Sequence, residues 1–377
     1  MKVEFYKHSL GAAEKQSILE TLDSLFLTTG PKTKQFEAEF ARFLGVAHGV
    51  GVTSCTAGLF LPLAAWNIGS GDKVIVPAMT FIATANVVLH AGAEVVFCDV
   101  EPDTGLMDLN QVEEVLKTTP NVKAIIPVHL YGQMVDMRAF KQLADKYGVK
   151  ILEDCAHCIE GERDGVKPGQ LGDAAAFSFY ATKNLACGEG GAVLTNDANL
   201  AEMLRIIRQH GMSKSAADRH VHYQHWDMEV LGYKANMFDL EAALLLPQMP
   251  KIKERWQRRE AIAQRYEQAF TQAGVDFPKT LPNVKHARHL FTIWAQDGKR
   301  DEVLSYLQNQ GIGVVVNYRS VPLRAYYKQR YGFKTGDFPV AERIGERTLS
   351  LPLYPKLADA EVEYVIAQVI AANVRFH

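Results

Sequence analysis

The sequence predicts an α/β protein with a large domain, built on a mostly parallel mixed sheet between helices, and a smaller C-terminal α+β domain. Three observations support this fold class. The 377 residues exceed the size at which one hydrophobic core usually stops growing, which favours about two domains. Hydrophobic residues make up 47% and charged residues 22%, as in ordinary globular chains. From Gly49 onward, short apolar runs alternate with helical stretches.

The N-terminal region is expected to be helical. Residues 12–26 form an amphipathic stretch, residues 28–31 indicate a turn, and residues 33–44 predict a second helix that Gly45 caps. The alternation that follows predicts right-handed βαβ units. The expected strands and helices are, in order, 73–76, 83–90, 94–100, 109–117, 124–128, 137–147 and 149–153.

The second half of the chain changes character. Two close strands at 174–180 and 192–195 suggest antiparallel or edge additions to the same sheet, and a helix is expected at 199–209 before a polar, irregular segment at 212–227. Pro247 and Pro250 break a long helical tract near residues 246 and 252. We therefore expect a large domain at 1–246 and a small domain at 247–377. The small domain is predicted to contain strands at 289–294 and 313–318 and helices at 301–310 and 358–372. The basic residues of 251–265 are interpreted as a solvated helix face.

Charge and hydropathy exclude several classes of function. Lys and Arg number 41 against 43 Asp and Glu, which gives a net charge of −2. The sequence has no block of basic residues, so we do not expect nucleic acid as a partner. The apolar stretch at 57–66 is too short to span a bilayer, and residues 1–6 lack the apolar core of a signal peptide. An odd number of cysteines, five, fits a reducing compartment, so we expect a soluble cytoplasmic protein.

Two strand ends carry candidate chemistry. Lys183 follows the apolar strand at 174–180 and precedes a Gly-rich segment, and Asp154 ends the strand at 149–153. Ligands of open α/β sheets bind at the carboxyl ends of the strands, where both side chains are expected. Taken singly, the lysine is more often a surface residue, and the aspartate is as often a helix cap or turn residue.

A third candidate is the turn at 53–58, which opens a helix that runs to about residue 65. The free N–H groups and positive end of that helix, with the hydroxyls of Ser54 and Thr56, could bind a phosphate, although Ser and Thr also cap helices for structural reasons. An amine, a carboxylate and a phosphate site are together what pyridoxal 5'-phosphate requires.

Several motifs in order also carry a resemblance to a known family. The sequence resembles the DegT/StrS family of pyridoxal-phosphate-dependent nucleotide-sugar aminotransferases, which has the aspartate-aminotransferase-like fold (type I). The motifs span most of the chain: Gly30-Pro31, Phe36-Glu37, Pro77-Ala78-Met79-Thr80-Phe81-Ile82-Ala83-Thr84, Glu153-Asp154-Cys155-Ala156-His157, Phe177-Ser178-Phe179, Lys183-Asn184, Gly188-Glu189-Gly190-Gly191, Gly232-Tyr233 and Leu351-Pro352-Leu353-Tyr354-Pro355.

The resemblance implies roles for individual cofactor-site residues. Lys183 would bond the cofactor as a Schiff base, and Asp154 would hold its pyridine nitrogen protonated. Phe81 would stack on the cofactor ring, and His157 would contact its phenolic oxygen. The phosphate would be bound by Thr56, the Ala57 amide and Ser178. In the family the loop that stands here at 232–237 reaches the phosphate of the other subunit, and Asn236 is favoured over Lys234 for that contact.

The resemblance also implies a reaction and partners. An amino group, usually from glutamate, would pass by a ping-pong mechanism to a keto group of a nucleoside-diphosphate-linked sugar, in a homodimer with shared active sites. Substrate contacts are implied for Thr29, His129, Tyr318 and Arg319. Two alternatives remain open: a dehydratase, although those relatives carry His where Lys183 stands, and a non-enzymatic regulator. The nucleotide, the aminated carbon and its stereochemistry are not specified.

The remaining cysteine and histidine motifs are interpreted as structural. Cys155 and Cys158 have C-x-x-C spacing around His157, but the second ligand pair of a zinc site is not visible in the sequence. Packing beside Asp154 is the favoured interpretation, and no metal is expected. For the other histidines considered, structural hydrogen bonding is at least as probable as catalysis: His129, His286 and His289.

Overall fold

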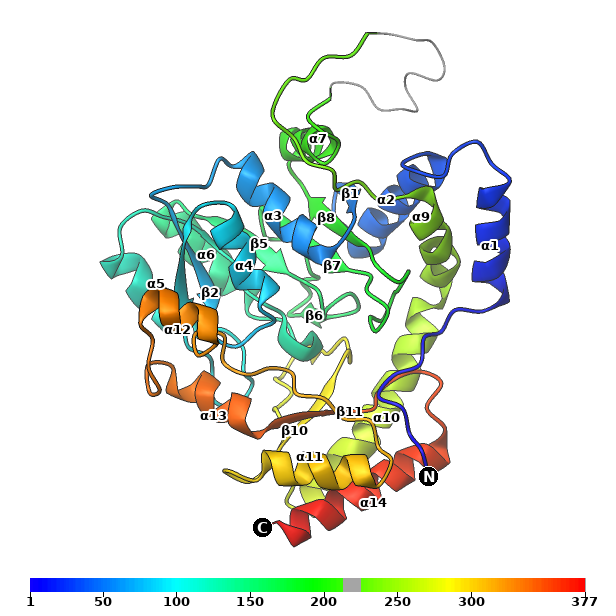
Figure 1. Cartoon of the computed structure of the whole chain (residues 1–377), viewed down its shortest axis with the longest axis vertical. Coiled ribbons are helices and arrows are strands. Elements are labelled where there is room, and N and C mark those ends of the chain that lie inside the picture. Colours follow the sequence, from blue (N-terminus) through cyan, green and yellow to red (C-terminus); the bar gives the residue numbers. More distant parts are fainter. Residues whose placement is uncertain (213–224, 377) are drawn as a thin grey trace.

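A seven-stranded sheet forms the centre of the protein, in the strand order β1-β8-β7-β5-β4-β2-β3 (Figure 1). The computed structural model describes residues 1–212 and 225–376. β8 runs antiparallel to its neighbours β1 and β7, and the other pairings of the sheet are parallel. Its strands are β1 (His48–Val52), β2 (Lys73–Pro77), β3 (Glu94–Cys98), β4 (Val122–Ile125), β5 (Lys150–Asp154), β7 (Ala174–Ser178) and β8 (Gly191–Thr195).

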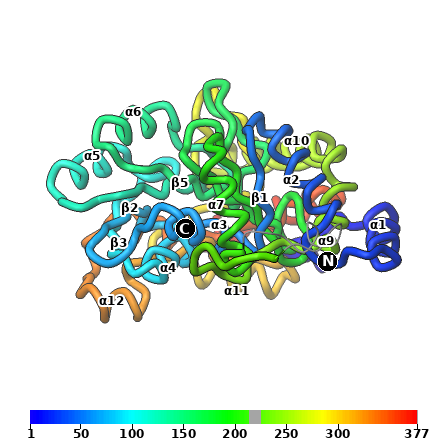
Figure 2. The backbone as a smooth tube through the Cα atoms, turned by 90° about the horizontal axis from the view of Figure 1, so that it is seen from above, coloured from blue at the N-terminus to red at the C-terminus, as the bar shows by residue number. Residues whose placement is uncertain are grey.

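Helices cover both faces of this sheet, as the view from above shows (Figure 2). α3 packs against α4 and α7 on one face, and α5 packs against α6 on the other. The helices of this part are α1 (Ala12–Leu22), α2 (Pro31–Leu44), α3 (Cys55–Ala65), α4 (Ala83–His90), α5 (Leu109–Thr118), α6 (Met137–Tyr147), α7 (Ala198–Ile207) and α9 (Asp239–Leu245), with the short 3-10 helix η1 (Leu130–Gly132). These layers confirm the predicted α/β fold class.

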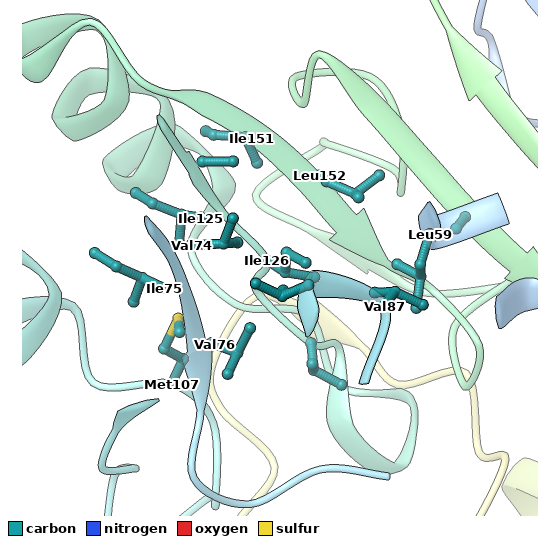
Figure 3. Packing of buried hydrophobic residues seen from close by; sticks show 14 of the residues in the cluster. Leu59, Val74, Ile75, Val76, Val87, Met107, Ile125, Ile126, Ile151 and Leu152 are labelled. Carbon is teal, nitrogen blue, oxygen red and sulfur yellow. The ribbon is translucent and has the colours of Figure 1, made fainter. Parts of the chain in front are cut away.

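The strands between these layers are apolar on both faces. Val74, Ile75 and Val76 of β2 are fully buried, because their side chains alternate between two helix layers (Figure 3). Gly45 closes α2 in the left-handed conformation with φ of 72°, as the sequence predicted. Along the described residues, no helix is both long and apolar enough to cross a lipid bilayer.

A second core lies beyond the large sheet. It joins Val3 to buried side chains between residues 262 and 372. Residues 321–344 instead contribute to the core of the large sheet. The boundary at residue 246 stays a prediction. The elements of this part are η2 (Leu246–Lys251), α10 (Ile252–Gln272), β10 (Phe291–Trp294), α11 (Arg300–Asn309), α12 (Ala325–Tyr331), α13 (Pro339–Arg347), β11 (Thr348–Leu351) and α14 (Asp359–Arg375), and β6 (Glu162–Arg163) pairs with β9 (Val284–Lys285).

Three expectations need correction. Residues 313–318 are not a strand, since they touch the sheet only through a bridge of Val315 with Ser350, and β10 pairs instead with β11, which the sequence did not predict. The basic face of α10 is not wholly solvated, because Arg255 and Arg259 are buried. The helices α12 and α13 were also missed. The break of the long helix at its prolines is confirmed, whereas most of the irregular segment predicted at 212–227 lies outside the described residues.

Candidate active site

Two predicted residues meet at the carboxyl edge of the sheet. Asp154 ends β5, and Lys183 lies on the loop after the neighbouring strand β7. Asp154 is buried; its Oδ2 accepts a hydrogen bond from Thr84 Oγ1 (2.8 Å) and its Oδ1 accepts one from the Ala156 amide (3.1 Å). Burial raises the pKa of Asp154, and these hydrogen bonds and the charge of Lys183 oppose the rise. The arrangement therefore places a carboxylate within electrostatic reach of an amine.

The pKa of the Lys183 amine lies below that of an ordinary lysine. Burial lowers its pKa to about 8, against smaller raising effects of Cys55 and Asp154. Its Nζ lies 3.3 Å from Nε2 of His289. An amine with such a pKa is about one-tenth neutral at pH 7, far more than an ordinary lysine, and a nucleophile or general base needs this neutral form.

Three ring side chains line the same site: His157, Tyr318 and Phe81. His157 accepts a hydrogen bond from the Tyr131 amide at Nδ1 (3.2 Å), and its Nε2 lies 3.1 Å from Tyr318 Oη. Burial lowers the pKa of His157 well below its ordinary value, so we assign its proton to Nε2, which donates to Tyr318. Phe81 lies 5.8 Å from Tyr318 between ring centroids and is 53% exposed. The exposed Phe81 ring can stack on a planar ligand.

The predicted phosphate site is built on the first turn of α3. Ser54 caps the helix, and its Oγ accepts a hydrogen bond from the Ala57 amide (3.1 Å). That amide, predicted to bind phosphate, is thus engaged within the chain, whereas Thr56 is exposed. Gly191 lets β8 approach this turn, because a Cβ there would lie 2.4 Å from the Ser54 carbonyl carbon. The strand partner of Gly191 is Ser178, whose Oγ accepts a hydrogen bond from the Tyr180 amide (3.3 Å), and its contact with a phosphate stays a prediction.

These groups fit pyridoxal 5'-phosphate. The cofactor needs an amine to bond, a carboxylate for its ring nitrogen, a flat apolar surface and a phosphate site. The chain presents Lys183, the buried Asp154, the exposed face of Phe81 and the N-terminus of α3. The donor set therefore supports the cofactor that the sequence predicted.

Thr29 and Asn236 belong to another group of contacts. Asn236 is 1% exposed and donates from Nδ2 to Thr29 Oγ1 (2.8 Å), while Thr29 donates to the Met237 carbonyl (2.7 Å). This burial argues against an Asn236 side chain that reaches another subunit. Lys234 is exposed two residues earlier, so the geometry favours Lys234 for that contact.

His129 does not lie open to a ligand. The ring is fully buried, with Nε2 2.9 Å from Glu153 Oε2 and Nδ1 accepting from the Val135 amide (3.3 Å). This geometry argues against the substrate contact implied by the resemblance and agrees with the structural interpretation. Cys155 also lies within reach of these groups, but burial raises the pKa of its thiol well above the ordinary value. We see no basis for a metal ion there, because the His129 and Glu153 atoms are occupied by protein partners.

Arg319 is exposed beside Tyr318 and belongs to an electropositive group. Burial, followed by the charges of Arg319 and Arg300, lowers the pKa of Arg324. The substrate contacts that the resemblance implies for Tyr318 and Arg319 stay predictions. The sequence did not predict Thr84 as the hydrogen-bond partner of Asp154, although Thr84 lies in the motif at 77–84 and on the first turn of α4.

Comparisons with known proteins agree with this site. Residues 8–370 match the DegT/DnrJ/EryC1/StrS aminotransferase family. The spore coat polysaccharide biosynthesis protein SpsC of Bacillus subtilis (strain 168) is 44% identical over 368 residues, which cover 96% of this chain and 94% of that protein. The PMP form of the putative sugar aminotransferase Spr1654 from Streptococcus pneumoniae has a TM-score of 0.94 at 30% identity and covers 100% of both chains.

A third similar structure is DesV of S. venezuelae in complex with a ketimine intermediate, with a TM-score of 0.88 at 35% identity over 95% of this chain and 93% of that one. Spr1654 is also known in a PLP form. These findings confirm the predicted family, the type I fold and the cofactor. The chain belongs to the DegT/DnrJ/EryC1/StrS aminotransferase family and is a transaminase that uses pyridoxal 5'-phosphate.

Proposed function

We propose that the protein transfers an amino group from glutamate to a keto group of a nucleoside-diphosphate-linked sugar. The observation that carries the proposal is that Lys183 and the buried Asp154 lie at the same edge of the sheet, close enough for their charges to interact, with the pKa of the lysine lowered to about 8. The exposed Arg319, with Arg300 and Arg324 near it, supports an anionic diphosphate on the substrate. The proposal includes the reducing, cytoplasmic location that is expected from the sequence. The five cysteines support it, because all of them are free thiols.

The residues divide the chemistry among them. When bound, the cofactor supplies an electron sink for charge that develops on the substrate carbon. The Asp154 carboxylate would hold a proton on the pyridine nitrogen, and Phe81 would support the ring. Lys183 would bond the cofactor and, once released, would carry a proton from the substrate carbon and return it as a general acid. Because the enzyme would hold the amino group between the two half-reactions, the proposal predicts ping-pong kinetics.

We also propose that a homodimer completes each site. Large apolar side chains are exposed beside the site and on the segment that carries Lys234: Phe81, Ile82, Tyr180, Leu231, Tyr233 and Phe238. Exposed apolar groups of this kind mark protein interfaces. Lys234 of one subunit, rather than Asn236, would reach the phosphate site of the other. Light scattering is expected to give a dimer, and a fully active monomer would contradict this proposal.

A substrate panel tests the function. Keto sugars linked to different nucleoside diphosphates, and the same sugars unlinked, are incubated with glutamate and analysed by mass spectrometry. Amination of at least one linked sugar, with Lys183→Ala inactive, is expected. Glutamate alone should yield about one equivalent of keto acid per active site. Amination confined to unlinked sugars would overturn the nucleotide assignment, and a requirement for both substrates before any keto acid forms would overturn the ping-pong order.

The two alternatives are not favoured by the site. The dehydratase alternative requires His where Lys183 stands. The regulator alternative is weakened by the intact Lys183 and Asp154, and a purified protein that is colourless and binds no cofactor would support it instead.

A further inference from the structure

A buried ion pair lies behind the catalytic lysine. Arg259 of α10 donates from Nη2 to Oε1 of Glu160, on the loop after β5, and both side chains are almost completely buried. A buried ion pair of this kind fixes its members strongly, because separating them would leave an uncompensated charge. The pair therefore gives a rigid reference point on the small-domain side of the site.

Asn184 is held in place by this ion pair through a hydrogen bond to Glu160. Its Nδ2 donates to Glu160 Oε2 (2.8 Å) and to the carbonyl of Ala287 (3.0 Å). A carboxylate and a carbonyl can only accept hydrogen bonds, so the amide nitrogen of Asn184 must face them. The opposite atom, Oδ1, then faces Nδ1 of His289 at 3.4 Å.

This orientation sets the tautomer of His289. Because Oδ1 of Asn184 is an acceptor, the proton of the neutral imidazole lies on Nδ1. Nε2 then carries a lone pair, and it lies 3.3 Å from Nζ of Lys183. His289 is 6% exposed, and burial, followed by the charge of Lys183, holds its pKa well below the ordinary value, so the ring stays neutral.

We propose that His289 is a positioning residue for Lys183, and that Asn184, Glu160 and Arg259 fix it in the tautomer that accepts a hydrogen bond from Nζ. The inference deepens the proposed function and rests on it. A released lysine amine has two protons and one lone pair. Donating one proton to His289 fills one of the three substituent positions on Nζ, which leaves the lone pair of Nζ only the two positions that point away from His289. The amine is thereby oriented for the proton transfers assigned to it.

The proposal also predicts how the lysine titrates. A neutral acceptor stabilises the ammonium form more than the amine, so His289 holds the pKa of Lys183 higher than burial alone would. The other groups whose charge bears on Lys183 are Asp154 and Cys55. Those that bear on His289, besides Lys183, are His157, Arg259 and His286.

The test measures the pKa of Lys183 in the cofactor-free protein. The lysine is labelled with acetic anhydride over a range of pH, and mass spectrometry of its peptide gives the pKa. His289→Leu is expected to lower this pKa by about one unit, the size of one hydrogen bond to a charged group. His289→Gln, which retains an acceptor oxygen, should stay closer to the unchanged protein. Asn184→Leu should give a smaller decrease, because both tautomers then form.

A matched control is His286→Asn, a change on the same segment, where Nδ1 of His286 accepts from the Arg288 amide (3.0 Å). It is expected to leave the pKa of Lys183 unchanged. An unaltered pKa in His289→Leu would overturn the proposal, as would an equal decrease in His289→Gln. If His289→Leu does not fold, Asn184→Leu tests the proposal in its place. A lowered pKa of Lys183 in that variant supports the hydrogen-bonded chain Arg259, Glu160, Asn184 and His289, and an unaltered pKa overturns it.

A second measurement separates this inference from the proposed function. The cofactor-loaded protein is treated with borohydride, and the modified lysine is located by mass spectrometry. Modification of Lys183 together with an unaltered pKa in His289→Leu would refute the positioning role alone. Absence of modification at Lys183 would refute the function itself.

Discussion

Glu153 and Asp154, the last two residues of β5, lie on opposite faces of the sheet and make different contacts. Glu153 points to one face of the sheet, where it accepts hydrogen bonds from the amides of Gly169 (3.1 Å) and Gly172 (2.9 Å) and lies against His129. Asp154 points to the other face, beside Thr84 and Lys183. Because successive side chains of a strand alternate, one residue step separates a structural anchor from the residue that we propose holds the cofactor. The comparison predicts that the two faces fail in different ways.

The largest effect is expected on the site face. Asp154→Asn removes the negative charge that would hold the ring nitrogen protonated, so kcat should fall about 10³-fold. Burial already disfavours the charged form of Asp154, as its raised pKa shows, so stability should hardly change. Steady-state kinetics and urea unfolding measure both quantities. A variant with normal kcat would remove Asp154 from the mechanism.

The anchor face should lose stability instead of activity. Glu153→Gln turns one acceptor oxygen into a donor that meets the amide of Gly169 or Gly172, which costs about 1–3 kcal/mol of unfolding free energy. The folded fraction should keep kcat within a few-fold of the unchanged protein. If kcat instead falls as far as in Asp154→Asn, with stability intact, the division of tasks between the two faces is wrong.

The sequence predicted the anchor strand better than the network around it. β5 could be predicted because a fully buried parallel strand is a continuous apolar run, and Asp154 because it ends that run. The strand β11 was missed because its partner β10 lies more than fifty residues earlier. The run at 313–318 has a strand-like composition, but most of its backbone finds no ladder partner.

The hydrogen-bonded chain that reaches Lys183 could not be predicted from the sequence for a related reason. Glu160, Asn184, Arg259 and His289 come from four separate parts of the chain, and no spacing in the sequence links them. Arg259 was taken for a solvated helix residue, because a helical pattern does not show which basic side chain meets a buried carboxylate. Sequence spacing identifies groups on one element, whereas this hydrogen-bonded chain depends on tertiary packing.

The amine of the site is expected to reduce stability. Its pKa is about 8 in the folded protein against an ordinary 10.5. The unfolded chain therefore binds more protons between these values, and stability from this group rises as pH increases from 8 to 10.5. After allowance for solvent screening, Lys183→Met should stabilise the cofactor-free protein by about 2 kcal/mol at pH 7.

The same comparison at high pH supplies the check. Urea unfolding at pH 10.5 should show most of the Lys183→Met difference gone, because the lysine is then almost wholly neutral in the folded protein and already half neutral in the unfolded chain. An equal stabilisation at both pH values would mean that packing, and not the charge of Lys183, produces the effect.

The smallest effect compares two helix caps, one at the site and one away from it. Ser54 caps α3 by accepting from the Ala57 amide, and Asp197 caps α7 by accepting from the amides of Asn199 (2.8 Å) and Leu200 (3.2 Å). Replacing either residue with Ala should cost about 1 kcal/mol of unfolding free energy. Only Ser54→Ala should weaken binding of pyridoxal 5'-phosphate, measured by absorbance titration, because only that helix start is proposed to hold the phosphate. Equal weakening in both variants would show that general loss of stability, and not the α3 terminus, controls cofactor binding.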